Sequence, residues 1–216
     1  CENQQILRVD KEMENPISSA IEFKIIKFLK KKINDCSVIV LSDYNKGVLT
    51  NNLIKKIIKI AKDYKKILIV DPKKKDFSVY AGATFITPNL KELKGATNTL
   101  GISTKSNEDS LVLKLSKKII NKFDFKAVIT TRSSNGISVV TDAGSFFHLP
   151  SEAKEVFDVS GAGDTVLAYL SSSISKGESL ESSIKISNVA AGLAVAKFGT
   201  SVVSIDEIDN KKQTKN

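Results

Sequence analysis

The chain has 216 residues, of which 41% are hydrophobic and 26% charged, and this length and composition are typical of one globular domain. No apolar run approaches the roughly 20 residues that a membrane-spanning helix requires. The sequence opens with neither a Met nor the pattern of a secretory signal. We therefore expect a cytoplasmic protein without a membrane partner, whose opening segment has been cut or is missing.

The formal charge of +9 calls for a test of nucleic-acid binding, because binding to phosphate backbones begins with clustered cations. Among the 33 basic residues only Arg8 and Arg132 are arginine, the preferred side chain for reading phosphates and bases. Most of the lysines lie on the polar faces of expected helices. The sequence therefore predicts no nucleic-acid partner. Cys1 and Cys36 are too few for a disulfide framework and lack metal-ligand spacing.

The first expected elements alternate between helix and strand. Asn15 and Pro16 predict the start of a helix, with an apolar stripe that continues to Leu29. The short, continuously apolar run Val38–Leu41 is typical of a strand that is covered on both faces. The later elements are a helix capped by Thr50 that runs to about Tyr64, strands at Ile67–Val70, Thr84–Thr87 and Ala127–Thr130, and helices from Asn89, at about Glu108–Phe123, Ala162–Lys176 and Leu180–Phe198.

This alternation predicts an α/β fold with three layers, in which helices cover both faces of a mostly parallel sheet. Gly136–Thr141 and Ser145–Leu149 are expected to form an antiparallel hairpin at the sheet edge. Ligands of open parallel sheets bind beyond the carboxyl ends of the strands. The loops at that edge are therefore the places where functional residues are expected.

The run from Asp158 to Asp164, Asp-Val-Ser-Gly-Ala-Gly-Asp, carries the most informative chemistry. Its small residues open a helix, so the amides of Gly161, Ala162 and Gly163 can form an anion hole at the positive end of the helix dipole. A carboxylate at this place can serve as the general base for a hydroxyl that attacks a phosphoryl group. The alternative is a glycine-rich turn in which Asp164 only complements the helix dipole.

The Asp158–Asp164 run resembles the signature of the ribokinase/PfkB sugar kinases, in which the matching final Asp is the catalytic base. Ser42–Gly47, Asp71–Phe77, Thr87–Glu92 and the turn at Thr131 further resemble the bacterial kinases that phosphorylate D-glycero-D-manno-heptose 7-phosphate at O1. The resemblance covers about residues 3–207. It implies a ribokinase-like three-layer sandwich.

The resemblance also implies a nucleotide site with a metal. Asn89, Leu90, Lys91 and Glu92 match the Asn-x-x-Glu element, in which Asn89 and Glu92 would organise Mg²⁺, through water, and the nucleotide phosphates. An amide and a carboxylate three residues apart can share one helix face and offer oxygen ligands. Taken alone, the same two residues are also an ordinary helix cap.

Further nucleotide contacts follow from the resemblance at Thr131, Ser133, Gly136 and Asn188, although Ser133 stands where the family often has Gly. The alternative for the first three residues is a polar connection into the hairpin. The alternative for Asn188 and its small neighbours is close helix packing.

On the sugar side, the resemblance assigns Asp43, Lys46 and Lys73 to the acceptor, and the two cations would suit a substrate that already carries a phosphate. Asn45 and Lys74 replace glycines that are usual in the closest family. Solvated loop lysines are the alternative for Lys73.

The resemblance divides the chain into a partial PfkB/ribokinase-like kinase domain at residues 1–208 and a disordered tail at 209–216. The lid and the first strand are expected to be largely missing, with Gln4–Val9 as a remaining lid-edge strand. The implied cofactors are ATP and Mg²⁺, with room for a monovalent cation, and the full-length protein is expected to be a homodimer. The expected function is ATP-dependent phosphorylation of the heptose 7-phosphate at O1, within ADP-heptose and lipopolysaccharide precursor synthesis. The alternatives are another PfkB sugar or nucleoside kinase, and a truncated nucleotide-binding module without turnover.

Overall fold

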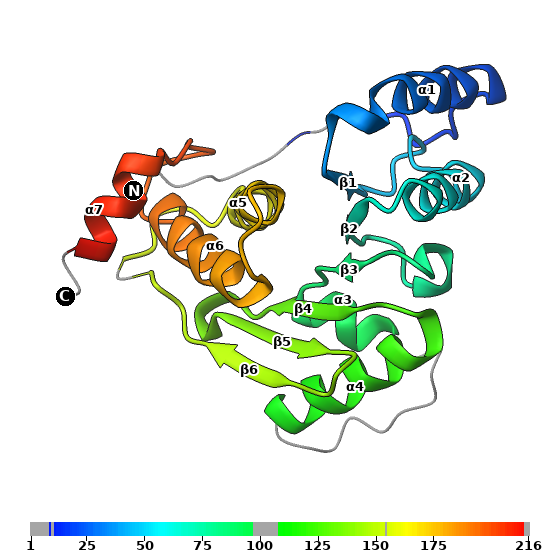
Figure 1. Ribbon diagram of the computed structural model, residues 1–216. Helices are drawn as coiled ribbons and strands as arrows, with labels where there is room; N and C mark the ends of the chain where they lie inside the picture. The colour runs from blue at the N-terminus through cyan, green and yellow to red at the C-terminus, as the bar shows by residue number, and fades with distance from the viewer. Residues whose placement is uncertain (1–8, 10, 97–107, 154, 214–216) are drawn as a thin grey trace.

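The computed structural model describes residues 9, 11–96, 108–153 and 155–213 and has a six-stranded sheet in the order β1-β2-β3-β4-β5-β6 (Figure 1). Strands β1 to β4 are parallel, whereas β5 and β6 are antiparallel to their neighbours. The predicted α/β fold with a hairpin at the sheet edge is therefore confirmed. The strands are β1 Val38–Ser42, β2 Ile67–Asp71, β3 Phe85–Ile86, β4 Ala127–Thr131, β5 Ile137–Thr141 and β6 Phe146–Leu149.

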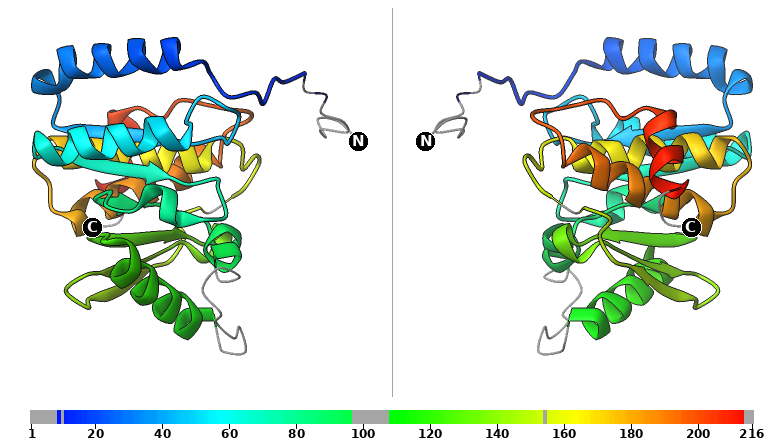
Figure 2. Two further views of the ribbon diagram at one scale, coloured as in Figure 1. Left: turned by 90° about the vertical axis from the view of Figure 1, so that its right-hand side faces the viewer. Right: turned by 90° about the vertical axis from the view of Figure 1, so that its left-hand side faces the viewer.

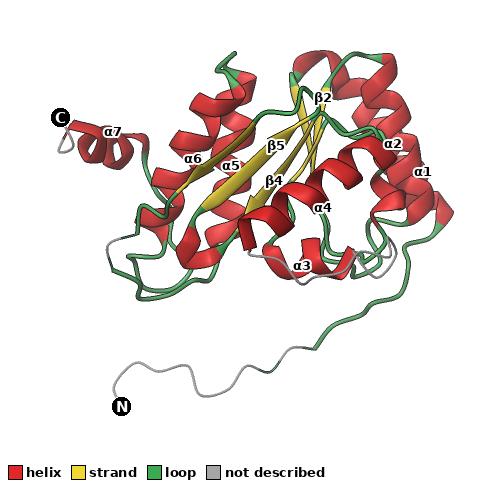
Figure 3. Cartoon of the chain, turned by 90° about the horizontal axis from the view of Figure 1, so that it is seen from below, coloured by secondary structure: helices red, strands yellow, loops and turns green. Residues whose placement is uncertain are grey.

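Helices cover both faces of the sheet (Figure 3). The helices are α1 Ser19–Lys32, α2 Asn51–Asp63, α3 Leu90–Gly95, α4 Glu108–Phe123, α5 Ala162–Ser175, α6 Leu180–Ala194 and α7 Ile205–Gln213, with short 3-10 turns at η1 Ile33–Asp35, η2 Phe77–Tyr80 and η4 Ser133–Asn135. Leu68 and Val70 of β2 pack into the core under α1, α2 and α4, whereas Ile69 between them packs against α5 and α6. This alternation is the two-residue period of a strand that is buried on both faces.

Local capping explains where several helices begin. Thr50 accepts the amide of Leu53 at 3.0 Å, which confirms the predicted start of α2. Helix α1, which lies over α2 (Figure 2), begins later than predicted because Ser18 is its N-cap. Asn15 and Pro16 precede that helix, and the amide of Ile17 donates to the Gly47 carbonyl at 3.0 Å.

Several predicted boundaries differ from those of the structure. Strand β3 is confined to Phe85–Ile86, and α6 ends at Ala194 rather than at Phe198. Helix α7 continues to Gln213, so helix replaces the first part of the tail that was expected to be disordered from residue 209. The expected lid-edge strand Gln4–Val9 lies almost entirely outside the described residues. No helix in the described ranges has the length and apolarity to cross a membrane.

Parallel pairing brings the carboxyl ends of the first strands to one edge. Ser42 at the end of β1 pairs with Asp71 at the end of β2, and Val70 pairs with Ile86 of β3. Because the loops after these strands leave at the same edge, residues far apart in sequence meet there. The beginning of α5 faces this edge.

Candidate active site

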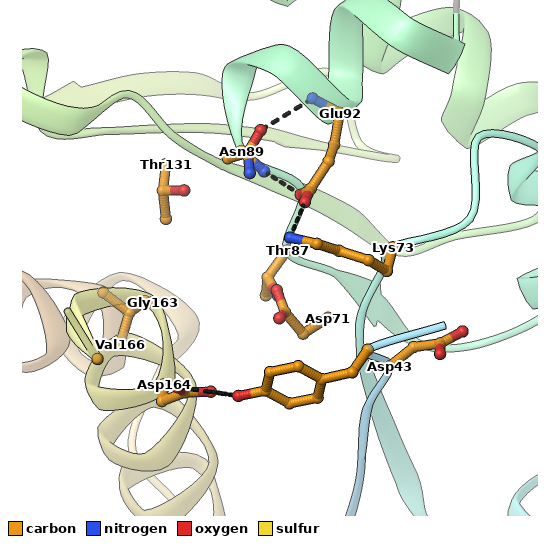
Figure 4. A pocket seen from close by; sticks show the side chains of 12 residues that line it. Asp43, Asp71, Lys73, Thr87, Asn89, Glu92, Thr131, Gly163, Asp164 and Val166 are labelled. Atoms are coloured by element: carbon orange, nitrogen blue, oxygen red, sulfur yellow. Dashed lines mark hydrogen bonds and ion pairs between the residues drawn. The ribbon is translucent and has the colours of Figure 1, made fainter. Parts of the chain in front are cut away.

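A pocket of about 200 Å³ lies at the carboxyl edge of the sheet (Figure 4). It is smaller than the roughly 300–1,000 Å³ of a complete ligand site, so it fits the reacting groups of a substrate rather than a whole nucleotide. The lining residues come from the last residues of β2 and β4, from the loops after β1, β2 and β3, and from the starts of α3 and α5: Asp43, Tyr44, Asp71, Lys73, Thr87, Asn89, Glu92, Thr131, Gly161, Gly163, Asp164 and Val166.

Asp164 stands in the first turn of α5 and its carboxylate enters the pocket (Figure 4). The side chain is exposed, and the hydroxyl of Tyr44 donates to its two oxygens, each at 3.1 Å. Asp164 is therefore accessible to a ligand.

The loop before Asp164 has the shape of an open helix start. The N-cap residue Gly161 has a φ of +79°, a conformation that glycine adopts without steric cost, and it offers no side chain to cap the helix. Asp158 accepts the amide of Ser160 at 2.8 Å and fixes the turn before it. The amide of Ala162 donates to the Val159 carbonyl at 3.3 Å, so one of the three predicted anion-hole amides already has an internal acceptor.

Asn89 and Glu92 form a capping box, the alternative to a metal site that their spacing also indicates. The Asn89 Oδ1 accepts the amide of Glu92 at 2.8 Å, and the Glu92 Oε2 accepts the amide of Asn89 at 2.9 Å. The other carboxylate oxygen of Glu92 accepts the Lys73 ammonium at 2.9 Å, and this bond raises the pKa of Lys73. Both residues still line the pocket, so capping and ligand binding are compatible.

Of the other two residues in the same element, Leu90 packs partly against the core under α4, and Lys91 is exposed. Neither side chain lines the pocket. A nucleotide contact from Leu90 or Lys91 would therefore come from the backbone of that residue, or from its side chain at a point outside this pocket.

Asp71, at the end of β2, lies between Asp164 and Glu92 (Figure 4). Burial raises its pKa to about 6, and the nearby charges of Glu92 and Asp164 act in the same direction, against a hydrogen bond from Thr87 and the charge of Lys73. The Thr87 hydroxyl donates to the Asp71 carboxylate at 3.0 Å. Asp71 is therefore a carboxyl group that takes up a proton in the weakly acidic range.

The pocket gathers more negative than positive side chains. The carboxylates of Asp71, Glu92 and Asp164 share it with the ammonium of Lys73. A polyphosphate would be repelled by such a set unless a cation lay between them. Oxygen donors of this kind suit Mg²⁺, which keeps several of its waters, although the described residues contain no group of three or more His, Cys, Asp or Glu arranged to hold a metal directly.

The predicted sugar contacts are placed differently from one another. Lys73 lines the pocket, whereas Lys46 pairs with Glu12 outside it. The carboxylate of Asp43 is buried and accepts the Tyr80 hydroxyl at 2.6 Å, with the Lys74 ammonium 3.3 Å away. Asp43 also lines the pocket, but these partners hold its carboxylate from beneath the loop, and a sugar contact from Asp43 stays a prediction.

The other residues that the resemblance assigns to the nucleotide do not all lie at the pocket. Thr131 lines the pocket, but Ser133 is exposed outside it. A Cβ on Gly136 would lie 2.0 Å from the carbonyl oxygen of Leu149, so this glycine permits a close approach of two backbones. Asn188 is buried and donates to the Pro150 carbonyl at 2.7 Å. Gly136 and Asn188 thus both contact the segment at and after the end of β6, and a nucleotide contact from either residue stays a prediction.

Tyr44, Asp71, Thr87 and Val166 line the pocket without having been singled out in the sequence. Asp71 and Tyr44 do lie in the loops that were expected at the ligand edge. Their position at the carboxyl end of β2 and just after β1 is the available signal, but it does not distinguish them from their neighbours.

The chain spans less than half of the curated relatives that it matches. It is 43% identical over 206 residues to the bifunctional protein HldE of Paramagnetospirillum magneticum and 41% identical to that of Geobacter metallireducens, with 95% of this chain but 41% of each relative covered.

Solved structures have the same fold. Phosphofructokinase-2 from Escherichia coli, solved in complex with potassium, matches with a TM-score of 0.76 at 18% identity, covering 90% of this chain and 62% of that one. Ribokinase from Arabidopsis thaliana, solved with ribose and ATP, matches with a TM-score of 0.69 at 19% identity, covering 92% of this chain and 60% of that one. These likenesses confirm the ribokinase-like fold. A sequence profile of the pfkB family carbohydrate kinases matches residues 11–207, and the chain belongs to that family.

Proposed function

We propose that this chain is the kinase part of an enzyme that transfers the terminal phosphoryl group of ATP to a sugar hydroxyl, with Asp164 as general base. The observation that carries the proposal is the exposed Asp164 carboxylate at the start of α5. It lies in a pocket whose other wall consists of polar and charged residues at the carboxyl edge of the sheet. The family match over residues 11–207 supports this reaction.

In this proposal Asp164 takes the proton of the acceptor hydroxyl as its oxygen forms a bond to the γ-phosphorus. The bond from that phosphorus to the bridging oxygen breaks, and ADP leaves with the electron pair. The amides at the start of α5, those of Gly161 and Gly163 above all, stabilise the negative charge that grows on the transferring group. Thr131 lines the same pocket and would contact a phosphate there.

Asn89 and Glu92 would hold Mg²⁺ through water, with Asp71 beside them. The metal, when bound, supplies positive charge between these oxygens and the phosphates. Lys73 is placed to contribute a second positive charge, since its ammonium already lies against Glu92 on the pocket side.

For the acceptor we propose D-glycero-D-manno-heptose 7-phosphate, phosphorylated at O1. Support comes from the likeness of the loops after β1, β2 and β3 to those of heptose 7-phosphate kinases, and from the identity of about 40% to bifunctional proteins named HldE. A cytoplasmic location and a homodimer remain predictions. A monovalent cation is supported by the potassium in one solved structure of the same fold.

A substrate panel tests the reaction. The full-length protein that contains this chain is incubated with MgATP and heptose 7-phosphate, unphosphorylated heptose, fructose 6-phosphate or a nucleoside, and phosphorus NMR identifies the product. We expect ADP formation with the heptose 7-phosphate and a new phosphate at O1. Activity with only an unphosphorylated acceptor contradicts the heptose assignment. Nucleotide binding without transfer to any acceptor contradicts the kinase proposal and favours a binding module.

A further inference from the structure

Tyr44 connects the two sides of the pocket. It follows β1, whereas Asp164 belongs to α5, 120 residues further along the chain. The Tyr44 hydroxyl lies 3.1 Å from both carboxylate oxygens of Asp164, so its single proton is shared between them. Among the side-chain hydrogen bonds of the described residues, these are the ones that Asp164 accepts.

The loop around Tyr44 is held in place by the contacts of its neighbour Asp43, whereas more than half of the Tyr44 side chain is exposed. The neighbouring Asp43 is held from below by Tyr80 and Lys74, and it accepts the amide of Asn45 at 2.7 Å. The Tyr44 side chain itself is 55% exposed. The ring can therefore turn about its own side-chain bonds while the loop stays in place.

The hydrogen bond from Tyr44 to Asp164 is of the same kind as the bond that a sugar hydroxyl would donate to the general base. A general base must have the proton that it takes within about 2.6–3.2 Å, and the phenol oxygen meets that condition. At 3.1 Å the contact is longer than the roughly 2.5–2.7 Å of a strong O–H···O⁻ bond, which suits an interaction that a ligand replaces. Burial, together with the hydrogen bond to Asp164, raises the pKa of Tyr44, so the phenol keeps its proton near neutral pH.

We propose that the Tyr44 hydroxyl occupies the place of the sugar hydroxyl on Asp164 until the sugar binds and displaces it. The inference rests on the proposed kinase function. In the sugar-free state the phenol keeps a water molecule from the same position, where Asp164 would activate that water against ATP. Tyr44 therefore lowers wasteful hydrolysis at a small cost in sugar affinity.

The substitution Tyr44→Phe removes the hydroxyl and keeps the ring. Tyr64→Phe is the matched control, since Tyr64 is also a partly exposed tyrosine but lies at the end of α2, away from the pocket. In the full-length protein we measure ADP release without sugar, and then kcat and KM with the heptose 7-phosphate. A thermal melt shows that each variant is folded.

For Tyr44→Phe we expect sugar-independent hydrolysis to rise about fivefold and the KM for sugar to fall about fivefold, the size of one weak hydrogen bond, with kcat within about twofold of wild type. Tyr64→Phe should match wild type in all three quantities. A fall in kcat at unchanged KM means that Tyr44 orients the base during transfer, and it contradicts displacement. Unchanged kinetics in a folded Tyr44→Phe also contradict it. Wild-type protein that phosphorylates no sugar contradicts the kinase function itself, which is a separate result.

Discussion

The Glu92 carboxylate lies 2.9 Å from the Lys73 ammonium, and this ion pair joins the loop after β2 to the first turn of α3. The other oxygen of Glu92 completes the cap of that helix. One carboxylate therefore fixes local structure and faces the pocket at the same time. The two roles can be separated experimentally, because capping does not require a charge.

Replacing Glu92 by Gln tests the metal role. Glutamine also completes a capping box, and the Lys73 ammonium is half exposed, so we expect the free energy of unfolding to change by less than about 1 kcal/mol. The Mg²⁺ concentration for half-maximal activity should rise roughly 10–100-fold, as for residues that act on a metal through water. Titration of activity with MgCl₂ measures this.

Glu181→Gln is the control for Glu92→Gln, since Glu181 forms an exposed ion pair with Lys185 on α6, away from the pocket. It should leave the Mg²⁺ requirement unchanged. An unchanged requirement in Glu92→Gln as well would remove Glu92 from the metal site and leave it only the cap.

Asp71→Asn tests the effect of burying a carboxylate among like charges. The pKa of Asp71 is raised to about 6 in the folded protein, so the folded state binds its proton more tightly than the unfolded chain, and the contribution of Asp71 to stability falls as the pH rises from about 4 to about 6. The asparagine keeps an acceptor for Thr87 and avoids the charge. We expect Asp71→Asn to be more stable than wild type by about 1–3 kcal/mol above pH 6, and equal to it below pH 4.

Urea unfolding at several pH values measures the difference between Asp71→Asn and wild type. A difference that stays constant between pH 4 and pH 7 would show that Asp71 titrates normally. If Asp71→Asn exceeded wild type in stability more at low pH than at neutral pH, the pKa of Asp71 would be lowered rather than raised by folding.

The order of the elements could be predicted from the sequence because their signals are local. Thr50 caps α2 as expected, and the range Glu108–Phe123 of α4 agrees with the prediction. The start of α1 could not be predicted in this way, because it depends on a contact between the backbones of Asn15 and Gly47. The contact is so close that a Cβ added to Gly47 would lie 2.1 Å from the Asn15 carbonyl oxygen. This tertiary contact keeps the Asn15-Pro16 pair outside the helix although its composition is typical of a helix start.

Gly136→Ala tests whether Gly136 is needed for the close approach of two backbones, rather than for the nucleotide contact expected from the resemblance. Gly136 has a φ of +84°, and its Cβ would meet the Leu149 carbonyl oxygen at 2.0 Å, so we expect destabilisation by more than about 2 kcal/mol. The control Gly95→Ala has a free path for its Cβ and should change the free energy of unfolding by less than about 1 kcal/mol.

Chemical denaturation measures both glycine variants, and nucleotide titration of the folded fraction gives the Kd for ATP. We expect that Kd to remain near the wild-type value in Gly136→Ala. A stable Gly136→Ala protein with weakened nucleotide binding would restore the nucleotide role.

Short motifs of the candidate site can be found in the sequence, whereas side-chain partners that lie far apart along the chain cannot. The glycine-rich start of α5 and the Asn89–Glu92 cap are short motifs, and the structure places parts of both in one pocket. Asp43 looked equally suitable for a ligand, but Tyr80, 37 residues away, encloses it. Asn188 likewise finds its acceptor on Pro150, 38 residues away. Such pairings depend on the packing of whole elements and leave no local pattern.

The role of Asp164 as a base is tested most directly by Asp164→Asn in the full-length protein, with Asp35→Asn in η1, the turn that follows α1, as the control. Asparagine keeps the size of the side chain but cannot take the proton of the acceptor. We predict that kcat for sugar phosphorylation falls at least about 100-fold while the Kd for nucleotide changes less than about threefold. Turnover near the wild-type rate in Asp164→Asn would contradict the account.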